Sequence, residues 1–224
     1  MNTKPEIKFK TSNKPVDYKE ATEFMEIYAK QVALGGKSEL IWLTSHKPIY
    51  TAGISAKDED LLNFNIPVFK TNRGGKYTYH DDGMRIIYVM LNLKNCFYPN
   101  PPDVAKFVLM LENWVITVLE KIGINGEVRK DRVGIWVTNK DGSEKKIAAI
   151  GIKLKQWISY HGIAININPN LEGFNGIVPC GIKDFGVTSV FDLGGKISFS
   201  KVDKIIKEEF FKIFTNYIKP TLLD

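Results

Sequence analysis

The sequence predicts an α+β fold, in which a mixed and largely antiparallel sheet is flanked by helices. Three stretches carry apolar residues at helical spacing, and short apolar runs typical of strands lie between them. In the second half, strand-like runs follow one another directly, which argues against a doubly wound parallel sheet. No repeat or linker interrupts the 224 residues, so residues 1–224 are expected to form a single domain.

Each expected helix carries one apolar face. The three helices are predicted at about residues 17–33, 103–122 and 200–218. Asp17 followed by Glu20 has the spacing of a capping box, Asp103 can cap the second helix, and Ser200 is a candidate cap for the third. We expect these apolar faces to pack into the core and not to hold a cofactor.

Five apolar runs are expected to form strands: 40–44, 85–93, 133–138, 146–154 and 161–167. The run 85–93 is almost unbroken, which is typical of a strand covered on both faces. Asp141-Gly142 lies in the short connector between the third and fourth runs and predicts a hairpin there.

Composition excludes several classes of protein. Hydrophobic residues make up 44% of the chain and charged residues 25%, which rules out a disordered chain, a collagen-like chain and a coiled coil. The N-terminal residues are polar and no apolar run approaches the ~18 residues of a spanning helix, so neither a signal peptide nor a membrane segment is expected. Two cysteines, Cys96 and Cys180, are too few for a disulfide framework, and we expect a cytoplasmic protein with free thiols.

The net charge of +6 is concentrated in one part of the chain. Nine basic and four acidic residues lie between Lys121 and Tyr160. Such a patch attracts an acidic partner, which on charge alone is a nucleic acid, an acidic protein or an anionic ligand. Solvated lysines on an ordinary surface are the alternative interpretation. No nucleic-acid-binding motif is present, so nucleic acid is not expected as a partner.

Arg73-Gly74-Gly75-Lys76 is a candidate binding loop. Paired glycines let a backbone approach a ligand closely, and the nearby amides can bind an anion or a carbonyl oxygen. The spacing of a Walker loop or a dinucleotide fingerprint is missing, and a tight turn between strands is the alternative. His80, just downstream, is a candidate general base or substrate-orienting residue. It forms no metal-ligand spacing with His46 or His161, so no zinc is expected. No other metal or cofactor is expected either.

Cys180 and Lys146 are the candidate catalytic residues. Pro179 and Gly181 frame the cysteine, which places the thiol on a turn, where nucleophiles are often held. A buried and inert thiol is the alternative, and Cys96 is interpreted in that way, as loop packing. A thiol needs a nearby cation to ionise at neutral pH, and Lys146 opens a strand rich in small residues that leave room for a ligand. A lysine at the solvent-exposed end of a hairpin is the alternative there.

Four stretches, in order and at matching separations, resemble the lipoyl(octanoyl) transferase family. They are RGGKYTYH at 73–80, RVGIWV at 132–137, KIAAIGI at 146–152, and HGIA at 161–164 followed by PCGI at 179–182. They are similar to the family's RGGxxTYH, RxGVWV, KIAAIGI, HG-A and PCGI motifs. The segment SHKPIYTAG at 45–53 also resembles the family's HPPVYTxG stretch.

The resemblance implies a fold shared with lipoate ligases and with the catalytic domain of biotin ligases. It implies transfer of an octanoyl group from octanoyl-acyl carrier protein, through a thioester on Cys180, to a lysine of a lipoyl-domain acceptor. Such acceptors are E2 subunits of 2-oxoacid dehydrogenases and the glycine cleavage H protein. Lys146 is implied to lower the pKa of Cys180 and to shuttle its proton. The residues implied to line the acyl pocket are Arg73, Gly74, Gly75, Lys76, Tyr77, Thr78, Tyr79, His80, Ala149, Ile150, Gly151, Gly162, Ile163 and Ala164.

One segment departs from the family pattern. After the TYH motif the family usually continues with GPGQ, whereas this chain has Asp81-Asp82-Gly83-Met84. The two carboxylates are expected to affect loop shape, acyl preference or partner docking.

Three alternatives stay open. An ATP-dependent lipoate or biotin ligase of the same fold class needs no cysteine, and the Pro-Cys-Gly frame of Cys180 argues against it. A non-catalytic binding module would use the basic patch alone. A transferase that moves octanoyl or lipoyl groups only between protein domains cannot be separated from the carrier-protein route by sequence.

Overall fold

The computed structural model describes residues 6–63, 65–130, 132–178 and 185–214. The helices are α1 (Tyr18–Ala33), α2 (Leu93–Phe97), α3 (Val104–Glu120) and α4 (Phe199–Ile213), with short 3-10 helices η1 (Asp58–Asp60) and η2 (Leu171–Gly176). The strands are β1 (Ile7–Thr11), β2 (Glu39–Thr44), β3 (Ile49–Ala52), β4 (Val68–Lys70), β5 (Tyr77–His80), β6 (Met84–Met90), β7 (Glu127–Arg129), β8 (Arg132–Thr138), β9 (Glu144–Lys155), β10 (Ile158–Asn166) and β11 (Gly186–Val187).

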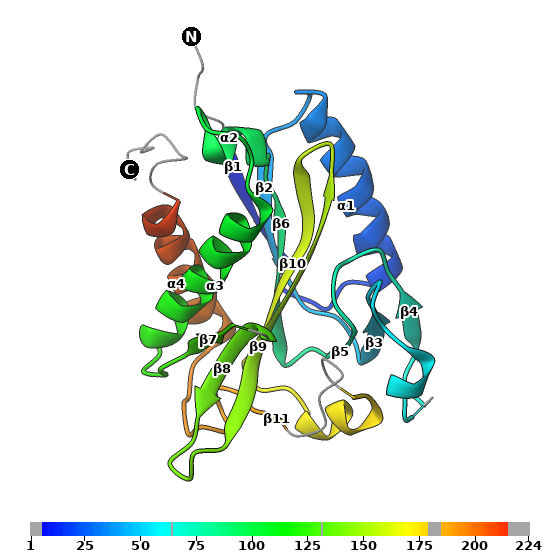
Figure 1. The fold of residues 1–224 in the computed structure, drawn as a ribbon, viewed down its shortest axis with the longest axis vertical. Coiled ribbons are helices and arrows are strands. Elements are labelled where there is room, and N and C mark those ends of the chain that lie inside the picture. The colour runs from blue at the N-terminus through cyan, green and yellow to red at the C-terminus, as the bar shows by residue number, and fades with distance from the viewer. Residues whose placement is uncertain (1–5, 64, 131, 179–184, 215–224) are drawn as a thin grey trace.

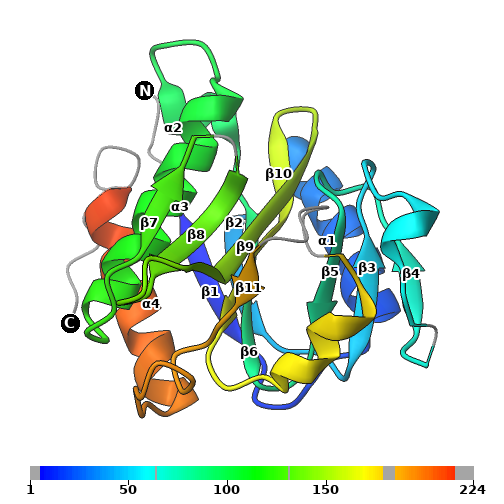
Figure 2. The same cartoon turned by 60° about the horizontal axis from the view of Figure 1, so that its bottom comes forward.

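The strands form one large and one small sheet (Figures 1 and 2). The large sheet has the order β1-β2-β6-β10-β9-β8-β7, and β11 pairs with β9. Its pairs are antiparallel except for β1 with β2 and β11 with β9. The small sheet has the order β4-β3-β5. The predicted α+β class with a mixed, largely antiparallel sheet is therefore confirmed.

Helices cover the large sheet on both faces (Figure 1). One core lies between the sheet and the pair α3 and α4, and the other lies between the sheet, α1 and the small sheet. The central strands β6 and β10 are buried along their whole length, because their two faces contribute to the two cores. The prediction that the run beginning at Arg85 is covered on both faces is thus confirmed.

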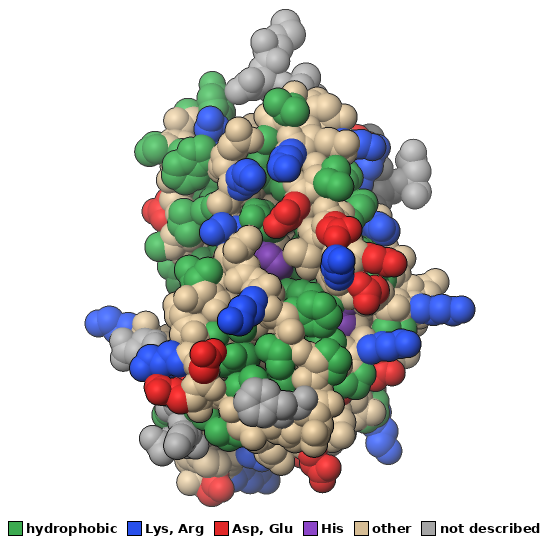
Figure 3. Space-filling model, turned by 90° about the vertical axis from the view of Figure 1, so that its right-hand side faces the viewer, with side chains coloured by type: hydrophobic (Ala, Val, Ile, Leu, Met, Phe, Trp, Pro, Cys, Tyr) green, Lys and Arg blue, Asp and Glu red, His purple; other side chains and the backbone are tan. Residues whose placement is uncertain are grey.

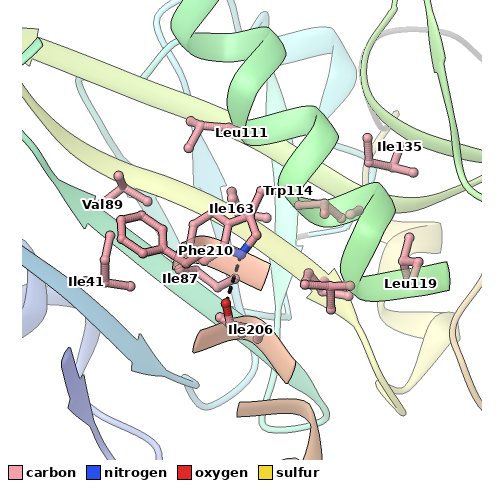
Figure 4. Close-up of a cluster of buried hydrophobic side chains, with 14 of the residues drawn as sticks. Ile41, Ile87, Val89, Leu111, Trp114, Leu119, Ile135, Ile163, Ile206 and Phe210 are labelled. Carbon is pink, nitrogen blue, oxygen red and sulfur yellow. Dashed lines mark hydrogen bonds between the residues drawn. The ribbon is translucent and has the colours of Figure 1, made fainter. Parts of the chain in front are cut away.

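Trp114 of α3 anchors the first core (Figure 4). Its indole is fully buried and donates a hydrogen bond of 2.9 Å to the carbonyl oxygen of Ile206 on α4. The ring also packs edge-on against Phe210, with 5.0 Å between centroids. Because the polar N–H has an acceptor inside the core, this large side chain is buried without leaving an unsatisfied donor.

Helix starts follow the expected chemistry at two of three positions. The Asp17 carboxylate accepts from the N–H groups of Lys19 and Glu20, and Asp103 accepts from Lys106. The third expectation was wrong, since Ser198 caps α4 and Ser200 lies inside the helix. The apolar Phe199 already belongs to the first turn, so the cap falls before it. The expected continuation of this helix beyond Phe214 lies outside the described residues.

Several short elements were not predicted from the sequence. β3, β4 and β5 have three or four residues each and carry tyrosine, threonine, lysine and histidine, so they lack a clear apolar alternation. Cys96, expected in a loop, lies in the short helix α2, where it is partly buried against the first core. Such short elements are stabilised by what they pack against and not by their own pattern.

A buried ion pair joins the sheet to α4 and generates a stability prediction. Arg85 on β6 and Asp203 on α4 are 5% and 8% exposed, and their Nε and Oδ1 atoms are 2.8 Å apart. Asp203→Ala leaves a buried guanidinium without its partner and should lower the free energy of unfolding by about 3 kcal/mol. The double variant Arg85→Met/Asp203→Leu should recover much of that loss, as measured by urea unfolding. A single-variant loss below about 1 kcal/mol would contradict this account.

Candidate active site

A cavity of about 230 Å³ opens between the large sheet and the segment 73–80, which leads into the small sheet. Its apolar wall comes from β6, β9, β10 and η2, and includes Ile86, Ile163, Ala164 and Phe174. The described lining residues include four cationic side chains, namely Arg73, Lys76, Arg132 and Lys146. No aspartate or glutamate is among these described lining residues. The cavity therefore combines an apolar surface with positive charge.

Most residues that the sequence pointed to are brought together here. The cavity is lined by Arg73, Gly75, Lys76, Tyr77, Thr78, His80, Lys146, Ala149, Ile150, Gly151, Gly162, Ile163 and Ala164. Two predicted pocket residues lie elsewhere. Gly74 donates its N–H to the carbonyl oxygen of Ile152, and Tyr79 points into the second core, where its ring packs against Phe174.

A register shift between β8 and β9 brings Lys146 and Ala149 to the same side of the sheet. Ile135 pairs with Ala148, but Trp136 pairs with Lys146, so one extra residue is inserted in β9. Ile147 and Ala148 are both buried in the first core. In a regular strand Lys146 and Ala149 would face opposite sides, whereas the bulge lets both line the cavity.

Lys146 is buried and not at the solvent-exposed end of a hairpin. It is 6% exposed, and its Nζ donates a hydrogen bond of 3.0 Å to the carbonyl oxygen of Val133. The ammonium also lies 4.7 Å from the centroid of the Trp136 ring. A carbonyl oxygen and an aromatic face thus hold the lysine at the cavity wall.

Arg73 holds the glycine loop in shape. Its Nη2 donates to the carbonyl oxygens of Thr51 and Lys76 at 2.7 and 2.8 Å, and its Nη1 donates to that of Gly74 at 2.9 Å. Gly75 adopts a φ of +85°, which favours glycine over residues with a side chain. The guanidinium therefore ties the loop to β3, while its positive charge stays beside the cavity.

The three histidines are all buried near this cavity. Burial lowers the pKa of His46, and burial, the other two histidines and Arg73 hold the pKa of His80 well below its usual value. Burial and the charge of Arg73 lower the pKa of His161 to about 3. The His46 Nε2 atom is 2.6 Å from the Tyr88 hydroxyl oxygen. The histidines are thus neutral at physiological pH.

The tautomer of His80 follows from its neighbour Thr51. The Thr51 hydroxyl oxygen accepts from Arg73 Nε at 3.3 Å and from Arg73 Nη2 at 2.8 Å. Its own proton therefore points to His80 Nε2, 3.4 Å away. The ring proton of neutral His80 then lies on Nδ1, which has no hydrogen-bond partner among the described residues. A buried donor is left available for an oxygen of a ligand.

Several cavity residues were missed by sequence reasoning. They are Tyr18, Met84, Ile86, Tyr88, Arg132, Val133, His161, Asn166, Phe174 and Val187. They come from α1, β6, β8, β10, η2 and β11, and most are apolar or aromatic residues that read as ordinary core. Arg132, Val133 and His161 belong to the motifs quoted above, so membership of a motif was the only local sign of their position.

The predicted nucleophile Cys180 lies outside the described residues. The described segment after it borders the cavity, and the described segment before it is held by the residues of η1. Val178 donates its N–H to the carbonyl oxygen of Asp60, and Val187 pairs with Lys146 and lines the cavity. The other cysteine is a poor nucleophile, because burial raises the pKa of the Cys96 thiol.

Asp81, the buried residue at the departure from the family pattern, has a structural role. Its carboxylate accepts from the N–H groups of Gly83 and Asn170 at 2.9 and 2.8 Å, and from the Tyr79 hydroxyl at 3.2 Å. These bonds fix the β5–β6 turn to the start of η2. Asp82 is exposed. The first carboxylate thus shapes the loop behind the cavity.

The surface, the possible metal ligands and the helices of the described residues can be compared with what metal-binding and membrane proteins require. Hydrophobic side chains and charged residues of both signs share the face seen in Figure 3, and histidine atoms are visible between them. No described histidine, cysteine, aspartate or glutamate residues form a group of three or more suited to a metal ion. No helix in the ranges described is long and apolar enough to cross a membrane.

Solved structures with the same fold define the class of protein. The chain matches an archaeal lipoate protein ligase from Thermoplasma acidophilum with a TM-score of 0.69 at 13% identity, covering 94% of this chain and 85% of that one. It matches the biotin protein ligase of Aquifex aeolicus with a TM-score of 0.57 at 16% identity, covering 96% and 72%. The fold is that of lipoate and biotin ligase catalytic domains, as the resemblance implied.

The chain belongs to the family described as the lipoyl protein ligase A/B catalytic domain, which matches residues 17–211. It is 51% identical to an octanoyltransferase of Wolbachia pipientis subsp. Culex pipiens, over 91% of this chain and 97% of that protein. It is 47% identical to an octanoyltransferase of Ehrlichia chaffeensis, covering 94% and 97%. The expected family is confirmed, and the chain is an acyltransferase enzyme.

Buried neutral His161 generates a pH prediction. Its pKa is about 3 in the folded protein and ~6.5 in the unfolded chain, so between these values only the unfolded chain binds the proton. Above pH 6.5 His161 is neutral in both states and does not lower the free energy of unfolding. As the pH falls below 6.5, protonation of the unfolded chain lowers the free energy of unfolding, by about 2 kcal/mol at pH 5. His161→Asn retains a residue that tolerates φ +60° and should reduce the drop in unfolding free energy between pH 7 and pH 5 by that amount. An unchanged drop in denaturant titrations would contradict the buried neutral state.

Proposed function

We propose that residues 1–224 act as one catalytic domain that transfers an octanoyl group to a lysine of lipoyl-domain proteins. The octanoyltransferase names of the relatives and the lipoate ligase fold support this activity. The observation that carries the proposal is the buried Lys146 at the wall of an apolar, positively charged cavity, where it pairs with Val187, just after the Cys180 segment. The donor is octanoyl-acyl carrier protein, and the route passes through a thioester on Cys180.

The first step is a thioester exchange. The Cys180 thiolate attacks the carbonyl carbon of the donor thioester, a new C–S bond forms, and the bond to the phosphopantetheine sulfur breaks. The departing sulfur takes the proton that Lys146 received from the thiol. A thiolate and a tetrahedral oxyanion are both negative, and the cations of the cavity favour both.

The second step forms the amide. The acceptor lysine amine attacks the acyl-enzyme carbonyl, an N–C bond forms, and the Cys180 sulfur leaves. Lys146, having given up its proton in the first step, takes the proton of the amine. Neutral His80 offers its Nδ1 proton to an oxygen of the bound substrate. Neither step needs ATP, a metal or another cofactor.

The apolar wall of the cavity takes the acyl chain. Ala149 and Ala164 are directly opposite each other on β9 and β10, and both line the cavity. Two small side chains at a paired position leave a channel along the sheet, next to Ile86 and Phe174. Each buried methylene contributes about 0.8 kcal/mol, so an eight-carbon chain provides much of the binding energy.

The basic region 121–160 suits an acidic carrier protein. Within it Glu144 pairs with both Arg129 and Arg132, which neutralises part of the excess. Lys130, Lys140 and Lys155 are exposed on the turns and ends of the strands. Long-range attraction of this kind speeds encounter with an acidic donor and weakens at high salt.

The proposal is tested by intact-protein mass spectrometry after mixing with octanoyl-acyl carrier protein and no ATP. The wild type and Cys96→Ala should gain one octanoyl group that hydroxylamine removes, whereas Cys180→Ala should gain none. Lys146→Ala should be acylated at least a hundredfold more slowly. Acylation that survives in Cys180→Ala would exclude the assigned nucleophile. A wild type that is inactive without ATP but forms an acyl-adenylate would favour a ligase.

Filling the channel should change the preferred chain length. Ala164→Leu removes room for about two methylenes, so kcat/KM for octanoyl donors should fall about tenfold while that for butanoyl donors stays within threefold. Ala105→Leu, on the exposed surface of α3, is the matched control and should change neither value. Equal losses for both chain lengths would show that the acyl chain lies elsewhere.

A further inference from the structure

Glu112, in the middle of α3, is a buried carboxylate that the proposed chemistry does not use. It is 5% exposed and its helix otherwise presents Leu111, Trp114 and Val115 to the first core. Its Oε1 accepts a hydrogen bond of 3.2 Å from the N–H of Gly134 on β8. Burying an acidic group among apolar side chains is costly, so its presence here calls for a specific partner.

Gly134 connects this carboxylate to Lys146. The peptide group between Val133 and Gly134 donates its N–H to Glu112, and its carbonyl oxygen accepts from Lys146 Nζ at 3.0 Å. The two ends of a trans peptide point in opposite directions. One rigid peptide group therefore lies between the carboxylate on α3 and the ammonium at the cavity.

The backbone at Gly134 leaves no room for a side chain. Its φ is +115°, and a Cβ there would lie 2.6 Å from the carbonyl oxygen of Ala148 and 3.3 Å from Lys146 Cε. A glycine is free to rotate its flanking peptide groups, so something must select one orientation. In the opposite orientation the N–H would face the ammonium, and Lys146 would lose the Val133 carbonyl oxygen as an acceptor.

We propose that Glu112 is a positioning residue that orients the Val133–Gly134 peptide group and thereby holds Lys146 at the cavity. An ionised carboxylate accepts hydrogen bonds and donates none, so it favours the N–H end of the peptide over the carbonyl end. The carbonyl oxygen is then presented to Lys146. Burial raises the pKa of the Glu112 carboxyl, while the Gly134 N–H and the positive charge of Lys146 oppose that rise. This inference rests on the proposed role of Lys146.

The test compares single-turnover acylation of the full-length enzyme by octanoyl-acyl carrier protein. Glu112→Leu should lower the maximal rate at least tenfold and change the half-saturating donor concentration less than twofold. Glu112→Gln keeps the shape and an acceptor oxygen, and should retain at least a third of the rate. Glu120→Leu, at an exposed position on the same helix, is the matched control and should keep the wild-type rate.

A double-mutant cycle separates positioning from a general structural effect. In the Lys146→Ala background, Glu112→Leu should slow the reaction less than twofold further, because the group it positions is gone. Multiplicative losses, or a tenfold loss in Glu112→Gln, would overturn the inference. A wild-type rate in Glu112→Leu, together with a slow rate in Lys146→Ala, would also overturn the inference. That result would leave the proposed function intact. A wild-type rate in Lys146→Ala itself would instead remove the proposed role of the lysine.

Discussion

The site depends on one extra residue in β9. The register shift opposite Ile135 and Trp136 lets Ile147 and Ala148 both enter the core under α3. As a result Lys146 and Ala149, three positions apart, reach the same cavity. A strict alternation would have placed one of them in the helical layer, where an ammonium would lie among leucine and tryptophan side chains. The bulge thus brings the proposed catalytic lysine and the proposed acyl-binding wall together on one strand.

The second constraint on the site is the burial of two positive charges, Arg73 and Lys146, beside the cavity. Arg73 and Lys146 are buried, and the contacts that hold them at the cavity include carbonyl oxygens, a hydroxyl and an aromatic ring. The described lining residues hold no carboxylate, although Glu144 pairs with Arg132 and Asp60 lies 3.9 Å from Lys76 outside the cavity lining. Burial together with the positive charge of Arg73 lowers the pKa of His80 and His161. Positive charge at the cavity also favours negative charge on a ligand or a nucleophile. The Glu112 carboxylate is linked to Lys146 by hydrogen bonds to the two ends of the Val133–Gly134 peptide group.

Asp81, in the segment that departs from the family pattern, affects the cavity indirectly, through the shape of a neighbouring loop. Asp81 does not enter the cavity but binds the N–H groups of the neighbouring turn and of η2. It therefore holds the β5–β6 turn against the start of η2, at the position where the family pattern quoted above has glycine. Phe174 of η2 reaches the cavity, so a carboxylate outside the site helps to set one of its walls.

The sequence by itself determined the long elements, most of their caps and the family. Leu111, Trp114 and Val118 are spaced three and four residues apart, which predicts the helix that the structure has at Val104–Glu120. The apolar motif at 146–152 predicts a strand and lies within the strand Glu144–Lys155. Four motifs in the right order also identified most of the residues that line the cavity. These features are local, because neighbouring residues in one element are enough to express them.

Only the tertiary structure decided how these pieces meet. The short strands of the small sheet, the inward turn of Tyr79 and the bulge before Ala148 all depend on contacts between segments far apart in the chain. Tyr18, Tyr88 and Phe174 read as core residues in the sequence, and a cavity forms beside them only because the two sheets leave room there. Glu112 reads as an ordinary polar position on a helix. Its link to Lys146 exists because α3 packs across β8 and β9, and such a long-range contact has no local sequence pattern.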